Sequence, residues 1–219
     1  MRRILPGVLA ILAALAFGIW ALPSLPDPMA SHWGLDGRPD GWSSRSTTVF
    51  VLPLFGLLIA ALLAFVPRID PRRRSHEQHA GTWWVIANAS LVVISAIHIF
   101  VIGYGLGWNV PFNQVVAIGI GGLFLLIGNL MTRMRPNWFM GIRTPWTLSS
   151  DTVWRKTHRV GAYGFVAAGI VSILAGILIP ARAGLVLIVS AAIVGVGSLV
   201  YSYVAWRQEV GHAPKEAER

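Results

Sequence analysis

The sequence of 219 residues contains no cysteine and few charged residues, which make up 12% of the chain. Without cysteine there is no disulfide framework, no thiolate metal site and no cysteine nucleophile. An ordinary soluble domain carries about 25% charged residues. The low charge, together with a mean hydropathy of +0.63, therefore excludes an ordinary soluble enzyme and points to a protein of the lipid bilayer.

Asp, Glu, Lys and Arg are absent from six long apolar stretches of the chain. A helix that crosses about 30 Å of hydrocarbon needs about 20 mostly apolar residues. The stretches that meet this length are residues 4–22, 48–66, 83–106, 113–131, 160–180 and 184–206. The sequence therefore predicts an all-α integral membrane protein with six transmembrane helices. An external loop follows the first helix, and a structured cytoplasmic loop separates the fourth from the fifth.

Basic residues are scarce on one side of the predicted membrane. With the amino terminus in the cytoplasm, three of the 18 lysines and arginines lie outside, namely Arg38, Arg45 and Arg182. Cytoplasmic loops carry an excess of these residues, so we predict that both termini are cytoplasmic. A cleaved signal peptide remains the alternative for the first span. The net charge of +9 is then a sign of topology and of contact with anionic lipid, and direct nucleic-acid binding is not expected.

The spans divide the chain into four predicted parts. Residues 1–66 form an N-terminal two-helix domain with the external loop, and residues 67–82 form a basic cytoplasmic loop. Residues 83–206 form a four-helix domain, and residues 207–219 form a polar cytoplasmic tail. His76 and His79 of the basic loop lack the spacing of a zinc-protease motif, so we interpret that loop as solvated.

Small residues recur at every fourth position of the fifth span, at Gly164, Ala168, Ser172 and Gly176. Small residues let membrane helices approach closely. We expect this face to make helix contacts within the bundle, and a dimer interface is the alternative.

Strongly ionisable side chains are nearly absent from the spans, and His98 is the exception. Ion-coupled transporters usually need a carboxylate, lysine or arginine inside the membrane. A proton pump or sodium symporter of the usual design is therefore not expected. A passive transport pathway is not excluded by this absence. Asn88, Ser95 and His98 are candidates for a small polar patch, although a histidine in this setting more often bonds to a neighbouring helix.

The predicted external loop, residues 25–43, combines turn formers with tryptophans and acids. Trp33 and Trp42 are of the type that anchors at a membrane interface. Oxygen and imidazole donors suit zinc or calcium. The weak candidates for such a metal site are Asp27, His32, Asp36 and Asp40. Their spacing matches no standard motif, so Asx turns and salt bridges, such as Asp40 with Arg38 or Arg45, are the alternative.

The predicted loop over residues 132–159 interleaves three tryptophans with six basic residues. This composition is typical of a segment at the level of the lipid headgroups. The many turn formers favour a folded cap over the bundle instead, with Asn137 and Arg143 free to bond to backbone, lipid phosphate or a partner. Ser149 or Ser150 is suited to cap the helix that leads into the fifth span.

Two blocks of the sequence resemble known families. Gly128-Asn129-x-Met131, followed by residues 135–151 and 153–159, resembles the signature of the SdpI family, bacterial membrane proteins named for immunity to a sporulation-delaying peptide toxin. Leu25-Pro26, His32-Trp33 and residues 37–42 are similar to the uncharacterised domain that commonly precedes that family.

The resemblance implies a multi-pass protein of the bacterial cytoplasmic (inner) membrane with no catalytic activity and no cofactor. It would give immunity to, or sense, a membrane-active antimicrobial peptide. Its partners would be membrane lipids, a peptide toxin outside and a cytoplasmic transcriptional repressor, and a dimer is possible. The candidate binding residues are Asn129, Arg135, Asn137, Trp138, Arg143, Thr144, Trp146, Trp154 and His158 in the signature, and His32, Trp33 and Asp40 in the external loop.

Two other functions stay open from the residues alone. A small transporter or lipid-handling protein would use polar faces on the third and sixth spans, including Ser198, Tyr201 and Ser202. A metal-dependent membrane enzyme would use the acidic external loop or the segment from Asn137 to Arg143.

Overall fold

A computed structural model describes residues 2–69 and 80–211 of the chain. Its six long helices are α1 (Leu5–Ala21), α2 (Arg45–Ile69), α4 (Ala80–Gly105), α5 (Phe112–Met131), α7 (Asp151–Leu178) and α8 (Pro180–Gly211). All six are long and apolar enough to cross a membrane, which confirms the predicted fold class. The shorter elements are 3-10 turns at Arg2–Ile4 and Leu22–Ser24, strands β1 (Met29–Trp33) and β2 (Pro39–Ser43), and helix α6 (Pro145–Ser149). His76, His79 and residues 212–219 lie outside the described residues.

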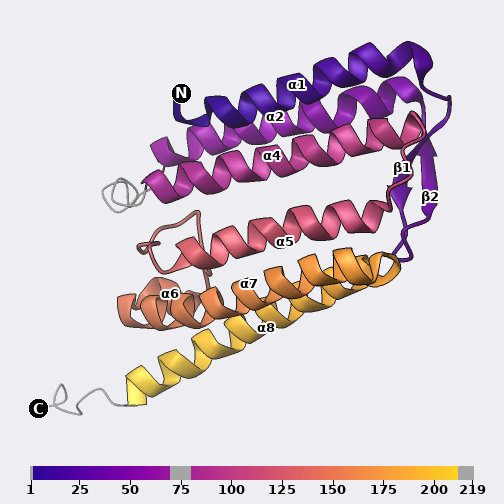
Figure 1. Cartoon of the computed structure of the whole chain (residues 1–219). Helices are drawn as coiled ribbons and strands as arrows, with labels where there is room; N and C mark the ends of the chain where they lie inside the picture. The colour runs from indigo at the N-terminus through magenta and orange to yellow at the C-terminus, as the bar shows by residue number, and fades with distance from the viewer. Residues whose placement is uncertain (1, 70–79, 212–219) are drawn as a thin grey trace, which may run out of the picture.

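The long helices form two groups of three. Helices α1, α2 and α4 pack together, α5, α7 and α8 pack together, and α4 meets α5 between the groups (Figure 1). The third span thus lies with the first two in space, although the sequence analysis assigned it to the four-helix domain over residues 83–206. The domain boundaries themselves stay a prediction.

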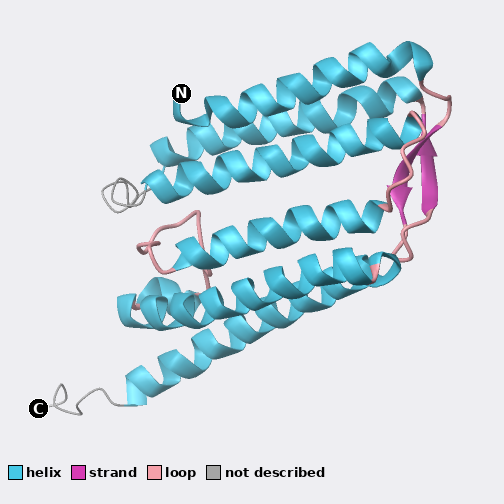
Figure 2. Ribbon diagram, in the orientation of Figure 1, coloured by secondary structure: helices cyan, strands magenta, loops and turns pink. Residues whose placement is uncertain are grey.

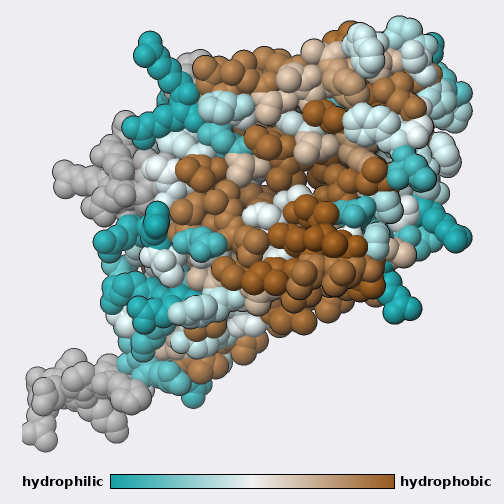
Figure 3. Space-filling model, viewed as in Figure 1, coloured by the Kyte–Doolittle hydropathy of each residue, from teal (hydrophilic) through white to brown (hydrophobic). Residues whose placement is uncertain are grey.

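The two ends of the bundle differ. The β1–β2 hairpin lies at one end, while α6 and both ends of the described chain lie at the other (Figures 1 and 2). Hydrophobic side chains cover the middle of the visible face and hydrophilic ones gather toward the two ends (Figure 3). This banding is the pattern that a bilayer requires of a spanning protein.

Helix α2 continues through Pro67 to Ile69. The sequence predicted that the second span ends at residue 66. Proline has no N–H to donate to the carbonyl four residues before it, which here belongs to Leu63. Trp83 of α4 donates its indole Nε1–H to that carbonyl oxygen at 3.2 Å. A neighbouring helix therefore supplies the donor that Pro67 lacks, and α2 ends at Ile69.

Helices α5 and α7 approach at the level of their backbones. A Cβ built on Gly169 would lie 2.7 Å from the carbonyl oxygen of Gly121, and a Cβ on Gly128 would lie 2.8 Å from that of Ala162. Ala168, Ser172 and Gly176 of the small-residue face are buried, and Ser172 Oγ lies 3.3 Å from Ser190 Oγ of α8. These three residues confirm the expected contact within the bundle.

The hairpin was not predicted from the sequence, which showed only turn formers in this loop. Its strands are five residues long, and their antiparallel register shifts around His32, so no clear alternation of polar and apolar residues marks them. Gly37 closes the turn with a φ of +79°, a conformation that glycine adopts at little cost. Asn113 Nδ2 of α5 donates to the Leu35 carbonyl oxygen at 2.9 Å and fixes the turn to the bundle.

Candidate functional site

The cap, which we define as residues 132–150, is organised around Asn137. This side chain is 0% exposed. Its Oδ1 accepts from the backbone N–H groups of Phe139 (2.9 Å) and Met140 (2.7 Å), and its Nδ2 donates to the carbonyl oxygens of Arg135 (2.9 Å) and Met140 (3.0 Å). The predicted bonds to backbone are therefore present, and they leave Asn137 unavailable to lipid or a partner.

Arg143 closes the same loop from its far end. Its Nη1 donates to the Trp138 carbonyl oxygen at 2.7 Å, while the Arg143 side chain itself stays exposed. Arg135 is also exposed, and the Trp138 side chain is 46% exposed. These three side chains are part of the accessible surface of the cap.

Thr144 connects the cap to α8. Its hydroxyl accepts from the Thr147 backbone N–H at 3.2 Å and donates to Ser202 Oγ at 3.0 Å. The Thr147 hydroxyl accepts in return from the Thr144 N–H at 2.9 Å, so the pair forms a capping box at the start of α6. Trp146 packs against Tyr203 of α8 with 5.1 Å between ring centroids. The cap is therefore held to α8 by both polar and aromatic contacts.

Trp154 and His158 hold the cap from α7, and both side chains are 1% exposed. Trp154 Nε1 donates to the Met134 carbonyl oxygen at 2.9 Å, and its ring stacks on His158 at 4.0 Å. His158 Nδ1 lies 2.9 Å from the Trp154 carbonyl oxygen, and Nε2 accepts from the Ile142 N–H at 3.1 Å. The carbonyl can only accept, so the ring is neutral with its proton on Nδ1.

Gly141 is required beside this ring. Its φ of +104° favours glycine, and a Cβ at this position would overlap His158 Nε2. The signature thus combines a histidine with the residue that leaves room for it.

Six of the nine signature candidates use their side chains to build the cap or to hold it to α7 and α8. They are Asn137, Arg143, Thr144, Trp146, Trp154 and His158. Arg135 contributes its carbonyl, and Trp138 both its carbonyl and an exposed ring. Asn129 is exposed on α5 and donates Nδ2 to the Leu125 carbonyl oxygen of its own helix at 2.8 Å.

An apolar cluster lies beneath the cap and joins the two helix groups. Its buried members are Trp83, Met131, Met134, Met140, Trp154 and Ala162. Trp83 comes from α4, whereas the others come from α5, the cap and α7. The cap is therefore packed on both groups of helices.

A basic groove borders the cap between α7 and α8. Arg155, Lys156 and Arg159 line it with Thr152 and Tyr201, and the cavity measures about 410 Å³. Arg155 Nη2 donates to Thr152 Oγ1 at 3.1 Å. Three cations in one concave surface favour an anionic group such as a phosphate.

The acidic residues of the hairpin do not share one site. Asp27 faces Arg45 at 3.9 Å, Asp36 faces Arg38 at 3.8 Å, and Asp40 Oδ1 lies 2.5 Å from His32 Nδ1. Among residues 2–69 and 80–211, no three His, Asp or Glu side chains gather in a way that could hold a metal ion. Exposed pairs such as these contribute about 1 kcal/mol or less each. The salt-bridge interpretation holds, although the partner of Asp40 is His32 instead of an arginine.

Trp33, a binding candidate from the sequence, lies in the interior of the hairpin end. It is 8% exposed, stacks on Phe112 with 4.1 Å between centroids, and meets Tyr104 edge-on at 5.6 Å. Trp42, by contrast, is 60% exposed. Trp33 therefore anchors the hairpin to α4 and α5 and presents no surface to a ligand.

The polar residues of α4 do not form one patch. Asn88 accepts from the Gly7 N–H at 2.7 Å and donates to the Arg3 carbonyl oxygen at 2.8 Å, so it holds the start of α1. Ser95 donates to the Leu91 carbonyl oxygen of its own helix at 2.8 Å. The polar faces proposed for a transport path are also apart, because α4 and α8 belong to different groups and Ser202 is bonded to Thr144.

From the sequence, Thr147 was assigned no role and Ser202 was placed on a polar face of a transport path, whereas both residues complete the cap. The pattern Thr144-Pro145-x-Thr147 carries a local signal, because threonine followed by proline is typical of the N-cap and first position of a helix. Ser202 has no such signal, since its partner is 58 residues away.

Comparison with known proteins identifies two regions. Residues 133–202 match the model of the SdpI/YfhL protein family, and residues 9–57 match a Domain of unknown function (DUF1648). The chain is 23% identical over 171 residues to "Immunity protein SdpI" of Bacillus subtilis (strain 168), which covers 78% of this chain and 80% of that protein. No solved structure matches the chain. These matches confirm the resemblance predicted from the two sequence blocks.

Proposed function

We propose that this chain, which carries the SdpI/YfhL family region at residues 133–202, is a membrane immunity protein that protects its host from a membrane-active peptide. The observation that carries the proposal is the coincidence of the family region with the cap. That region contains Asn137, Thr144, Trp154 and His158, and it ends at Ser202, the partner of Thr144. The family region therefore includes nearly all of the cap together with α7 and most of α8, the two helices that hold the cap.

The proposal includes no catalytic step. The buried polar groups of the signature, Asn137, Thr144 and His158, are occupied by bonds within the chain. A catalytic group must be able to reach its substrate, and these side chains are committed elsewhere. The proposed activity is binding.

In the proposed topology the cap faces the cytoplasm of a bacterial cell and the hairpin faces outward. Both ends of the described chain lie at the cap end, together with Arg133, Arg135 and Arg143. The excess of lysine and arginine on one side of the spans supports this orientation. A peptide arriving from outside meets the hairpin end first.

The exposed cap surface is the proposed docking site for a cytoplasmic regulator such as a transcriptional repressor. Arg135, Arg143 and the half-exposed Trp138 offer two cations beside an aromatic ring. Tryptophan and arginine are the residue types that dominate protein interfaces. A partner with an acidic surface would complement this face.

The basic groove of Arg155, Lys156 and Arg159 is the proposed contact with membrane lipid. At the cytoplasmic level of the bilayer it meets anionic headgroups, with an attraction of about 1 kcal/mol per basic residue. This contact would position the cap at the membrane surface.

The first experiment deletes the gene and exposes the cells to a panel of membrane-active peptides. We expect greater sensitivity to at least one peptide, restored by the intact gene. Unchanged sensitivity across the panel would contradict the immunity function.

A second experiment separates regulator docking from protection. The double variant Arg135→Ser/Trp138→Ala should lose docking in a membrane co-sedimentation assay with the purified candidate regulator. Arg182→Ser, an exposed arginine at the hairpin end of α8, is the matched control and should retain it. Equal co-sedimentation of both variants would contradict the docking site.

A further inference from the structure

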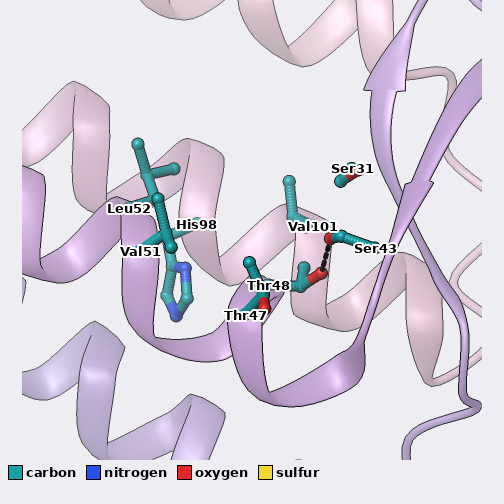
Figure 4. Close-up of a pocket in the computed structure, with 8 residues that line it drawn as sticks. All are labelled: Ser31, Ser43, Thr47, Thr48, Val51, Leu52, His98 and Val101. Carbon is teal, nitrogen blue, oxygen red and sulfur yellow. Dashed lines mark hydrogen bonds between the residues drawn. The ribbon is translucent and has the colours of Figure 1, made fainter.

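The cavity beside His98 offers a ligand few polar groups. It measures about 380 Å³ and lies between α2, α4 and the hairpin (Figure 4). Ser43 Oγ lies 2.9 Å from Thr48 Oγ1, so these two hydroxyls bond to each other, and both ring nitrogens of His98 have almost no accessible surface. The basic groove between α7 and α8 differs in this respect, because its cations reach the surface.

The three cations of the basic groove have no acidic partner in the described part of the chain. Within residues 2–69 and 80–211, the ion pairs all lie at the hairpin end, and no carboxylate lines the groove. Asp151 lies one turn before Arg155 on α7 without pairing to it. Arg155 Nη2 donates to Thr152 Oγ1 at 3.1 Å, and a guanidinium has further N–H groups for a ligand. The groove therefore keeps its positive charge.

The arrangement of these cations is unfavourable without a ligand. Arg155 and Arg159 are four residues apart on α7, and Lys156 follows Arg155 directly. Like charges four residues apart are neighbours on a helix surface and destabilise the helix. An anion in the groove would offset this repulsion and accept charge-assisted hydrogen bonds. The geometry therefore favours a bound anion.

The groove opens onto the apolar surface of α7. Arg159 is the last charged residue of this helix. Val160 lines the groove, and Tyr163 and Ile170 continue the same helix face with 73% and 47% exposure. A lipid headgroup in the groove would have this apolar face beneath it for its acyl chains. A soluble phosphate could not use that surface, so the surroundings favour a phospholipid.

The charge and the size of the groove favour a headgroup with two negative charges. A headgroup with a single phosphodiester would leave two of the three cations without a counter-charge. Cardiolipin carries two phosphodiesters in one headgroup, and basic pockets between membrane helices bind this type of lipid. Ligand cavities measure about 300–1,000 Å³, so a groove of about 410 Å³ has room for a headgroup whose acyl chains lie outside it.

We propose that the basic groove binds one phospholipid whose headgroup carries two phosphate charges, as cardiolipin does. Arg155 and Arg159 donate pairs of N–H bonds to the phosphate oxygens, and Lys156 adds a third positive charge. The Tyr201 hydroxyl donates from α8, and the acyl chains lie on the apolar face that begins at Val160. This inference rests on the proposed lipid contact and sharpens it from a general attraction to a site for one lipid.

The test uses the full chain in dodecyl maltoside micelles and counts bound lipids by native mass spectrometry. The probe is cardiolipin, compared at equal phosphate concentration with phosphatidylglycerol, which has one phosphodiester. We expect one tightly bound cardiolipin per chain and binding of phosphatidylglycerol about tenfold weaker. Equal binding of the two lipids would overturn the inference and would leave the general lipid contact in place. Binding of neither lipid would overturn both.

A pair of double variants separates the groove from the net charge. Arg155→Ser/Arg159→Ser should bind cardiolipin about 30-fold more weakly, the effect of losing two basic contacts. The matched control is Arg133→Ser/Arg135→Ser, which removes the same charge from exposed positions at the same end of the bundle. It should bind cardiolipin like the unmodified protein. Equal weakening in both double variants would overturn the site.

The variant Thr152→Glu separates binding from folding. It keeps all three cations and places a carboxylate three residues before Arg155 and four before Lys156, in the first turn of α7, where an acid favours the helix. It should therefore unfold at no lower denaturant concentration than the unmodified protein. It should also bind cardiolipin about tenfold more weakly, because its carboxylate takes the place of a phosphate. Unchanged binding would overturn the inference.

Inorganic phosphate distinguishes a lipid from a free anion. At equal phosphate concentration it should not displace cardiolipin from the full chain, because it has no acyl chains for the apolar face. Displacement would overturn the choice of a lipid. Lipid counting is independent of cell protection, so the failure of this inference and the failure of the immunity function are distinguishable.

Discussion

His158 and His98 are equally buried, each 1% exposed, yet their surroundings are opposite. One ring nitrogen of His158 is bonded to the backbone of the cap and the other to the backbone of α7, whereas those of His98 have no partner within the described residues. The first ring is a structural clamp between α7 and the cap. The second retains an unused donor and acceptor beside a cavity. Burial alone therefore does not tell a hydrogen-bonded histidine from an unpaired one, and the hydrogen-bond partners do.

The same contrast separates the two ends of the molecule. At the cap, Asn137 and Thr144 complete their bonds within the chain, so substitutions there should act on stability. At His98, removal of the unpaired imidazole should instead stabilise the fold.

The largest expected effect is that of Asn137→Ala. The substitution leaves two backbone N–H groups and two carbonyl oxygens without partners in a buried loop, at about 1 kcal/mol or more each, or about 4 kcal/mol in total. Denaturant unfolding of the purified protein in detergent micelles measures this loss. The control is Asn129→Ala, because Asn129 is exposed and should change stability by less than about 0.5 kcal/mol. Equal losses for the two variants would contradict the central place of Asn137 in the cap.

A smaller loss is expected for His158→Leu. The substitution removes the acceptor of the Ile142 N–H and the ring that stacks on Trp154, at a cost of about 2 kcal/mol. The same unfolding experiment measures it, and proteolysis between α5 and α7 should become faster. If His158→Leu is as stable as the unmodified protein, the ring is not a clamp.

The smallest expected effect has the opposite sign. His98→Leu replaces an unpaired ring by an apolar side chain of similar size and should raise the unfolding free energy by about 1 kcal/mol. The matched comparison is His158→Leu, the same substitution at the same burial. A loss of stability at His98 as large as that at His158 would show that His98 is bonded in the folded protein and would remove the contrast.

The sequence predicted the six spans because hydrophobicity is a local property that each stretch carries by itself. The continuation of α2 past Pro67 escaped it, since the compensating donor, Trp83, lies on another helix. The cap was also foreseen as a folded segment, from its turn formers and from the family signature. Asn137 bonds to the backbone of its own loop, which is one of the possibilities that the sequence offered. The partner of Thr144 was not foreseen, because Ser202 lies 58 residues away on α8. His98 was recognised as unusual, but only the fold shows that its nitrogens are unpaired and that a cavity lies beside it.

The most direct test is growth under a membrane-active peptide of cells that carry the unmodified protein or lack the gene. Cells with the unmodified protein should grow in the presence of at least one such peptide, whereas cells without the gene should not. Failure of the unmodified protein to protect against any peptide would contradict the immunity function.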